Sequence, residues 1–438
     1  MTPASHHHRH DGLDRQAPAT RRITLLLLIP AILITALGMV LLWPRDTPTA
    51  PTPPDGPTLI DGEVVAVAPE QCPPVPEGEE LPPEAVCGTV TVKLTSGASA
   101  GEQVTTDIPA GPGAPQVQAG DDVVLLVLQD EPGGPPSYSI MDFQRATPLW
   151  LIGAAFALAV IAFGRWRGVT ALVGLAVTFA VLLLFIVPAI LDGRSPVLVA
   201  IVGAAAIMLT VLYLTHGFTT TISIAVAGTL MSLTVTAVLS AAATAATRLS
   251  GVADETSNYL NITQADVNMR GLLLAGIVIG SLGVLDDVTV TQSATVTELA
   301  LANPGYRFRE LYAAATRIGR AHIASVINTI VLAYAGASLP LMLLFATGNT
   351  PIGELLTGQL IAQELVRSAV GTVGLITAVP ITTALAAIVA ARRSVPPGEL
   401  TTIAPEPPAK PAKSASAPPA EDPWAAFVER HSGWGERQ

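Results

Sequence analysis

Long apolar windows constrain this chain more than any other feature, because a helix of about 20 apolar residues spans the roughly 30 Å hydrocarbon core of a bilayer. Eight windows of this kind predict eight spanning helices. They cover residues 23–43, 149–164, 169–191, 197–218, 219–246, 271–290, 323–347 and 366–391. Half of the 438 residues are hydrophobic and 13% are charged, as expected for a chain that lies mostly in lipid.

The predicted fold is an all-α polytopic membrane domain with a small extracytoplasmic β-rich domain between its first and second helices. The segments in chain order are a disordered leader (1–22), a membrane anchor (23–43), a linker rich in Pro and Thr (44–57), the β-domain (58–147), seven membrane helices (148–391) and a disordered tail (394–438). The first window is longer than a typical signal-peptide core and lacks a cleavage site of small residues, so we expect it to be retained.

The arginines of the short loops predict the orientation of the chain, because basic residues favour the cytoplasmic side. With the N-terminus inside, the arginine-rich segments all lie inside: 21–22, 165–167, 307–320 and 392–393. Eight spans then place both termini in the cytoplasm and residues 44–147 outside. Only three of the 23 basic residues are lysines, which suggests a GC-rich bacterial genome. The expected location is the bacterial plasma membrane.

Short β-branched or alternating runs, separated by turn signals, predict five strands in the outer segment. These runs are 63–67, 89–94, 103–108, 122–128 and 138–141, and we expect them to form a small barrel or sandwich. Cys72 and Cys87 bracket a loop rich in Pro and Glu on the oxidising side of the membrane, which predicts a disulfide. Two unrelated free thiols are the alternative. Two cysteines alone supply too few ligands for a zinc site.

The sixth window carries the strongest functional signal, the pair Asp286-Asp287. The nearly apolar residues 271–285 form a helix of about 22 Å, which is shorter than the hydrocarbon core, so the pair falls inside the membrane. An aspartate at that depth is expected to face a water-filled cavity, a partner or a transported species. Asp287, Thr291 and Glu298 share one helical face, whereas Asp286 is rotated by about 100° from Asp287.

Hydroxyl side chains form a second candidate surface, in the fifth window. Spacings of three and four place them in one stripe along a helix: Thr229, Ser232, Thr236, Ser240 and Thr244. The stripe predicts either a polar path or hydroxyls that bond their own backbone and join helices. Asn328 in the seventh window is open to the same two interpretations, helix packing or site lining. Residues 306–320, with arginines beside apolar residues, predict a helix on the inner membrane surface.

Three segments resemble the YibE/F family of bacterial membrane proteins: 280–299, 319–340 and 371–384. With residues 138–145, the resemblance extends over roughly residues 60–391. The family signature holds one aspartate, a hydroxyl-rich run and a glutamate, so the resemblance implies Asp287 and Glu298 as the matching residues. Asp286 stands at a position that is apolar in much of the family. The resemblance implies a multipass membrane protein with an outer β-rich domain and supplies no activity.

The same residues argue against several function classes. The net charge of −11 is spread over the polar segments without a basic block, so no nucleic-acid partner is expected. Both intramembrane acids lie on one helix, whereas an aspartyl protease needs two acids that approach each other from different helices. The chain also lacks the common nucleotide, zinc-protease and hydrolase motifs. We therefore predict no enzyme activity, no cofactor and no metal site.

The leading hypothesis is a proton- or ion-coupled transporter, in which Asp287 binds a proton or cation in a cavity formed with the fifth and seventh spans. Asp286, Thr291, Glu298, Asn328, Ser232, Thr236 and Ser240 would complete the binding surface. The expected partners are the lipid bilayer and an ion or small polar solute. The alternative is a membrane scaffold whose outer β-domain binds a partner in the cell envelope.

Overall fold

The computed structural model describes residues 18–45, 58–70, 72, 87–109, 114–128, 136–347 and 351–392. The predicted tail, most of the linker and the leader before Pro18 lie outside these residues. The helical elements are α1 (Pro18–Leu42), α2 (Ala146–Gly164), α3 (Trp166–Val181), the π-helical turn η1 (Leu182–Ile186), α4 (Val187–Leu191), α5 (Pro196–His216), α6 (Thr220–Ala246), α7 (Glu255–Thr263), α8 (Met269–Ala302), α9 (Phe308–Ala337), α10 (Leu339–Thr347), α11 (Ile352–Thr357) and α12 (Gln359–Ala391).

Seven helices of the described chain are long and apolar enough to cross a membrane. They are α2, α3 with its continuation through η1 and α4, α5, α6, α8, α9 and α12. The first predicted span corresponds to α1, of which the described apolar part is Leu28–Leu42. These helices make the chain a multipass membrane protein.

Helices α8 and α9 extend furthest beyond the spans that the sequence predicted. α8 runs without a break for 34 residues and continues past the aspartate pair. α9 begins at Phe308, so the prediction of a separate surface helix at 306–320 was wrong. The reason is that Leu311 and Ala315 are fully buried in a cluster with residues of α8 and α12. The predicted seventh span is also interrupted after Ala337, and α10 starts with a proline at its second position.

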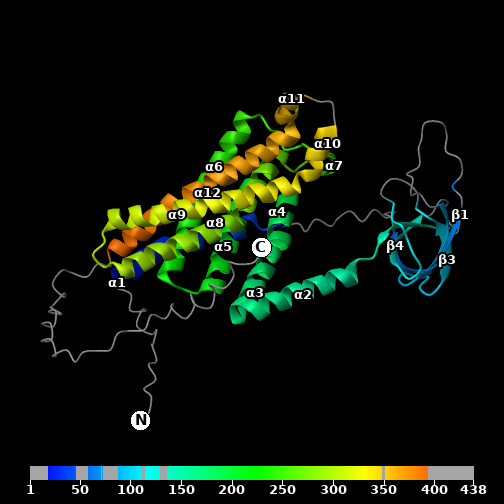
Figure 1. Ribbon diagram of the computed structural model, residues 1–438, viewed down its shortest axis with the longest axis horizontal. Coiled ribbons are helices and arrows are strands. Elements are labelled where there is room, and N and C mark those ends of the chain that lie inside the picture. The colour runs from blue at the N-terminus through cyan, green and yellow to red at the C-terminus, as the bar shows by residue number, and fades with distance from the viewer. Residues whose placement is uncertain are drawn as a thin grey trace, which may run out of the picture. The chain divides into compact units, whose positions relative to one another are not determined.

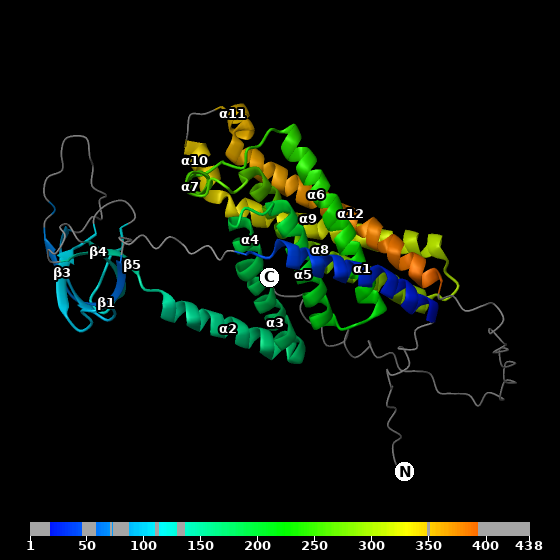
Figure 2. The same cartoon turned by 180° about the vertical axis from the view of Figure 1, so that it is seen from behind.

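Helices α6, α8 and α12 pack against one another and form the centre of the helical part (Figures 1 and 2). α6 and α12 approach closely at two glycines. A Cβ atom on Gly228 would overlap the Thr382 side chain, and a Cβ atom on Gly374 would overlap the Thr236 side chain. Glycines at these two positions therefore allow the two helices to touch.

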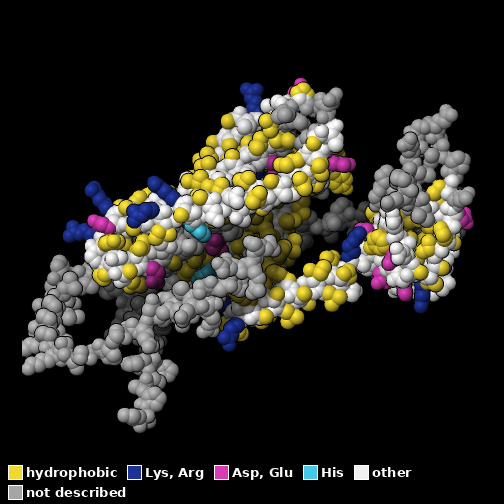
Figure 3. All heavy atoms as spheres, in the orientation of Figure 1, with side chains coloured by type: hydrophobic (Ala, Val, Ile, Leu, Met, Phe, Trp, Pro, Cys, Tyr) yellow, Lys and Arg dark blue, Asp and Glu magenta, His cyan; other side chains and the backbone are white. Residues whose placement is uncertain are grey.

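Charged side chains are sparse over the helical part (Figure 3). Lys and Arg side chains gather at the end where α9 begins and α12 ends, and Arg309 and Arg392 belong to this end. At the outset of α7, Asp254 caps the helix and its carboxylate accepts a hydrogen bond from the Ser257 backbone N–H. The backbone and side-chain hydrogen bonds that Ser257 makes with Asp254 lower the pKa of the Asp254 carboxyl.

All five predicted strands are present: β1 (Thr58–Glu70), β2 (Cys87–Leu94), β3 (Gln103–Asp107), β4 (Asp122–Leu128) and β5 (Ser137–Phe143). They form one antiparallel sheet in the order β3-β2-β1-β4-β5. The Thr106 hydroxyl donates a hydrogen bond to the Tyr138 carbonyl, which joins the two edge strands, so the sheet curls toward a barrel and is not a sandwich. Cys72 and Cys87 form a disulfide, with their Cα atoms 5.0 Å apart.

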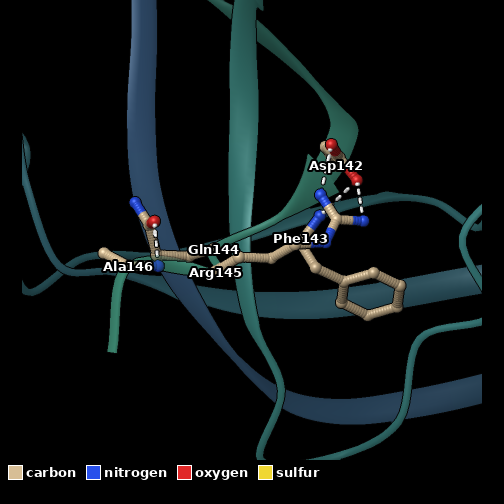
Figure 4. Close-up of polar contacts among 5 residues, drawn as sticks. All are labelled: Asp142, Phe143, Gln144, Arg145 and Ala146. Carbon is tan, nitrogen blue, oxygen red and sulfur yellow. Dashed lines mark hydrogen bonds and ion pairs between the residues drawn. The ribbon is translucent and has the colours of Figure 1, made fainter. Parts of the chain in front are cut away.

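A short polar segment connects β5 to α2 (Figure 4). The Arg145 guanidinium makes two hydrogen bonds to the Asp142 carboxylate, at 2.6 and 2.8 Å, and lies over the ring of Phe143. The hydrogen bond from Arg145 lowers the pKa of Asp142. Gln144 donates to the Asp61 carboxylate and accepts from the Ala146 backbone N–H, so it ties the first turn of α2 to β1.

Candidate functional site on helix α8

The aspartate pair lies at the middle of α8. Asp286 and Asp287 are the eighteenth and nineteenth of its 34 residues. Since a helix of that length measures about 51 Å, the pair is about 25 Å from either end. The half of α8 before the pair is apolar and the half after it is rich in hydroxyl groups. The carboxylates therefore stand at the boundary between these halves, in the middle of a helix that is long and apolar enough to cross a membrane.

One face of α8 is exposed along most of the helix. It combines small residues with the predicted carboxylate and hydroxyl groups, and we call it the acidic face: Gly276, Gly280, Gly283, Asp287, Thr291 and Glu298. A Cβ atom on Gly276 or Gly283 would meet no other atom within 4 Å. The acidic face is thus free of neighbouring helices of the described chain at these levels, and Asp287 is accessible from outside the helix bundle.

Asp286 has different surroundings from Asp287. Its side chain is half-buried, and its Oδ1 atom is buried without a hydrogen-bond partner among the described residues. Its backbone carbonyl accepts a hydrogen bond from the Thr289 hydroxyl. A buried carboxylate oxygen without a donor is unfavourable when it is charged. The local structure therefore favours a neutral Asp286, or a bound species that the described residues do not supply.

The hydroxyl stripe of α6 lies inside the bundle. Each of its five residues is 0% exposed: Thr229, Ser232, Thr236, Ser240 and Thr244. The first three hydroxyls donate to carbonyls of α6 itself, four residues earlier. The Thr229 and Thr289 oxygens lie 2.6 Å apart, which joins α6 to α8. These three hydroxyls fit the interpretation in which hydroxyls bond their own backbone and join helices. The Ser240 and Thr244 hydroxyls are buried without a hydrogen-bond partner among the described residues.

The structure does not assemble the predicted residues into one site. Asp287 is exposed, whereas Ser232, Thr236 and Ser240 are buried between helices. Glu298 shares the acidic face but lies eleven residues from Asp287, which is about 16 Å along the helix. Asn328 is exposed on α9. Of the residues predicted to form the site with Asp287, Asp286 and Thr291 are the ones that lie near it.

Sequence reasoning did not identify the main buried polar contact of the bundle. The Gln292 side-chain amide is 3% exposed and donates to the Ala315 carbonyl of α9 and to the Thr383 hydroxyl of α12, at 2.9 and 2.7 Å. The sequence signal was available, because Gln292 follows the buried residues Leu285 and Val288 at helical spacings. Its partners are distant in the chain and could not be read from the spacing.

No cluster of three or more His, Cys, Asp or Glu side chains capable of holding a metal ion is found among the described residues. The aspartate pair offers carboxylate oxygens from one helix only. This arrangement suits a proton or a hydrated cation better than a tightly coordinated metal ion, which needs ligands from several directions.

Comparison with known families identifies a match. A family model described as YibE/F-like protein matches residues 152–392, which is more than half of the chain and includes α8, α9 and α12. Neither a curated protein nor a solved structure matches this chain.

Proposed function

Because this chain belongs to the YibE/F-like protein family and is a multipass membrane protein, we propose that it is a proton- or cation-coupled transporter of a bacterial plasma membrane, with Asp287 as the group that binds the ion. One observation supports this proposal above the others. An exposed carboxylate stands at the middle of a membrane-spanning helix and makes no ion pair within the described chain.

The physical argument concerns the free energy of a charge in lipid. An aspartate at the centre of a spanning helix costs about 2.5 to 3.5 kcal/mol on insertion scales, and this cost persists unless the group is protonated, hydrated or paired with a cation. Asp286 adds a second carboxylate next to the first, and two adjacent like charges disfavour full ionisation of the pair. Uptake of a proton or cation removes both penalties, so the pair has a reason to bind one.

The roles of the two aspartates differ in this proposal. Asp287 exchanges the ion, because it is exposed on the acidic face, and Thr291 lies one turn further along the same face. Asp286 is half-buried and responds to the occupancy of its neighbour through charge repulsion. Glycines at 276 and 283 leave room beside the helix for water or for a moving element. Both termini are cytoplasmic in this arrangement.

The test is ion flux in proteoliposomes that contain the full chain. We expect wild-type protein to dissipate an imposed proton or sodium gradient, measured with a pH-sensitive dye inside the vesicles and a sodium-sensitive dye in parallel. Asp287→Asn should lower the flux at least tenfold, and Asp286→Asn should lower it less. Asp266→Asn, which removes an exposed carboxylate between α7 and α8, is the matched control and should leave the flux unchanged.

Flux that is unaffected by Asp287→Asn, in vesicles with equal amounts of protein, would contradict the role of Asp287. A complete absence of flux for protons, sodium and potassium in the wild type would favour the alternative function, a membrane scaffold. That alternative is supported by the first three hydroxyls of the stripe, because they bond carbonyls of α6 itself and the Thr229 oxygen lies 2.6 Å from the Thr289 oxygen of α8. A scaffold would bind an envelope partner through its β-domain, and crosslinking from that domain would identify the partner.

A further inference from the structure

A cavity in the helical part has polar side chains in its lining that do not include the aspartate pair. Helices α8, α9 and α12 enclose this cavity, whose volume is about 290 Å³, close to the lower end of the range of about 300 to 1,000 Å³ for ligand pockets. Its lining is mostly apolar, and Ser281, Tyr334, Arg367 and Ser368 supply the polar atoms. The function proposed above uses none of these four side chains.

Arg367 is the only charged residue of the cavity lining, and its guanidinium is incompletely bonded. Its terminal nitrogen Nη1 lies 3.3 Å from the Glu364 carboxylate, one turn earlier on α12. Its Nε atom is buried and has no hydrogen-bond partner among the described residues. One turn before Arg367, the Nε2 atom of Gln363 is also a buried donor without a described partner, and Gln363 is 7% exposed. Two unsatisfied donors on one face of α12 call for an acceptor.

The cavity has a polar end and an apolar end. Arg367 precedes Leu375 on α12 by eight residues, and Ser368 precedes it by seven. Along the helix axis, Arg367 and Leu375 are therefore about 12 Å apart. The lining from the other two helices near Leu375 is Val284 of α8 and Ile330 of α9. A ligand that fits this arrangement carries an anionic group at one end and an apolar chain at the other.

The depth of Arg367 fits the headgroup region of a bilayer. α12 has 33 residues and measures about 50 Å, so it exceeds a hydrocarbon core of about 30 Å by about 10 Å at each end when centred. Arg367 lies about 12 Å from the start of α12, which is close to the edge of the core, where lipid phosphates are found. Arginine forms paired hydrogen bonds with phosphate, so the guanidinium at this depth suits a lipid phosphate.

We propose that this cavity binds an anionic phospholipid, with the phosphate at Arg367 and one acyl chain directed along α8, α9 and α12 toward Leu375. The Tyr334 hydroxyl would lie beside the bound lipid, near Gly280, where a Cβ atom would be 3.7 Å from it. The lipid supplies the acceptor that the buried nitrogen of Arg367 lacks.

Lipid binding to the purified full chain, measured by native mass spectrometry, tests this proposal. The probes are phosphatidylglycerol and phosphatidylcholine with identical acyl chains. We expect the wild type to bind the first phosphatidylglycerol at least about tenfold more tightly than phosphatidylcholine. Both lipids carry the phosphate, but the choline cation of phosphatidylcholine would be held near the Arg367 guanidinium and repelled by it. Arg367→Gln should reduce this preference to less than twofold, and Arg367→Lys should retain most of it.

A second variant tests the cavity independently of the charge. A Cβ atom at Gly371 meets nothing within 4 Å, so the backbone at this position accepts a side chain. The leucine of Gly371→Leu should occupy the cavity and lower the affinity for both lipids at least tenfold. Gly336→Leu, at an exposed and equally open position outside the lining of the cavity, should bind both lipids like the wild type. Arg392→Gln, at the opposite end of α12, should keep the preference for phosphatidylglycerol.

Three results would overturn the proposal. The first is equal affinity of the wild type for the two phospholipids. The second is a preference that survives both Arg367→Gln and Gly371→Leu. The third is tight binding of oleate to the wild type without any preference for phosphatidylglycerol, which would assign the cavity to a fatty acid. Because the readout is binding and not ion flux, its outcome is separate from that of the Asp287 experiment.

Discussion

At the scale of single residues, the buried amide of Gln292 determines how three helices meet. It is bonded to a backbone carbonyl of α9 and to the Thr383 hydroxyl of α12, and the Thr383 hydroxyl in turn donates to the Val379 carbonyl of its own helix. A Cβ atom on Gly319 of α9 would overlap the Gln292 side chain, so the residue of α9 at this contact must be a glycine. One side chain thus fixes the register of α8 against both neighbours.

We predict that Gln292→Met destabilises the protein by about 1 to 3 kcal/mol, because the volume is retained while a buried carbonyl and a hydroxyl lose their donor. The double variant Gln292→Met with Thr383→Val should show a coupling of about 0.6 kcal/mol, the average for hydrogen bonds between membrane helices. Unfolding by a denaturing detergent measures both. Thr234→Val on the exposed side of α6 is the control, and an equal loss of stability there would contradict this prediction.

The sequence predicted the different surroundings of the two aspartates, because helical phase depends only on residue spacing. It did not predict which surface each one meets. Asp287 was expected in a cavity with α6 and α9, yet the buried side of α8 faces α6 through Thr289. The packing of this side of α8 against α6 depends on contacts between residues 60 positions apart in the chain. Local spacing holds no information on such pairs, so the composition of the site could not be read in full.

At the scale of elements, the spacing of apolar residues predicted the spans and strands well and their ends less well. Every predicted strand lies within or overlaps an observed strand, since alternation is a local property. The start of α9 was missed because Arg309, Arg317 and Arg320 made the segment resemble a surface helix. Leu311, Ala315, Gly319 and Ile323 repeat every four residues and form its buried stripe. Arginines on one face did not prevent the other face from packing into the bundle.

The contact between α6 and α12 leads to an element-scale prediction. Gly374→Ala should destabilise the protein by about 1 to 3 kcal/mol, because the new methyl group would overlap Thr236. Gly371→Ala, three residues earlier on the same helix, meets open space and should be neutral or stabilising by up to about 1 kcal/mol. Thermal unfolding in detergent compares the two variants. Similar losses of stability for both would show that α6 and α12 do not meet at Gly374.

At the scale of the whole molecule, the charge pattern and the disulfide point to the same orientation in the membrane. Arginines gather at the end where α9 begins and α12 ends (Figure 3), and the positive-inside rule predicts that such an end faces the cytoplasm. The disulfide between Cys72 and Cys87 is a bond that persists in oxidising compartments, such as the outer side of a plasma membrane. The two arguments rest on different residues, and both favour the proposed orientation, in which the sheet lies outside.

Labelling with a membrane-impermeant maleimide in intact cells tests this orientation. Glu255→Cys, in the first turn of α7, should be labelled without lysis, whereas Gly305→Cys, in the turn between α8 and α9, should be labelled only after lysis. The wild type is the control, because Cys72 and Cys87 are joined and should react only after a reductant is added. Their reaction in intact cells would then report the sheet itself. Labelling of Gly305→Cys before lysis would reverse the orientation, and with it the side from which an ion reaches Asp287.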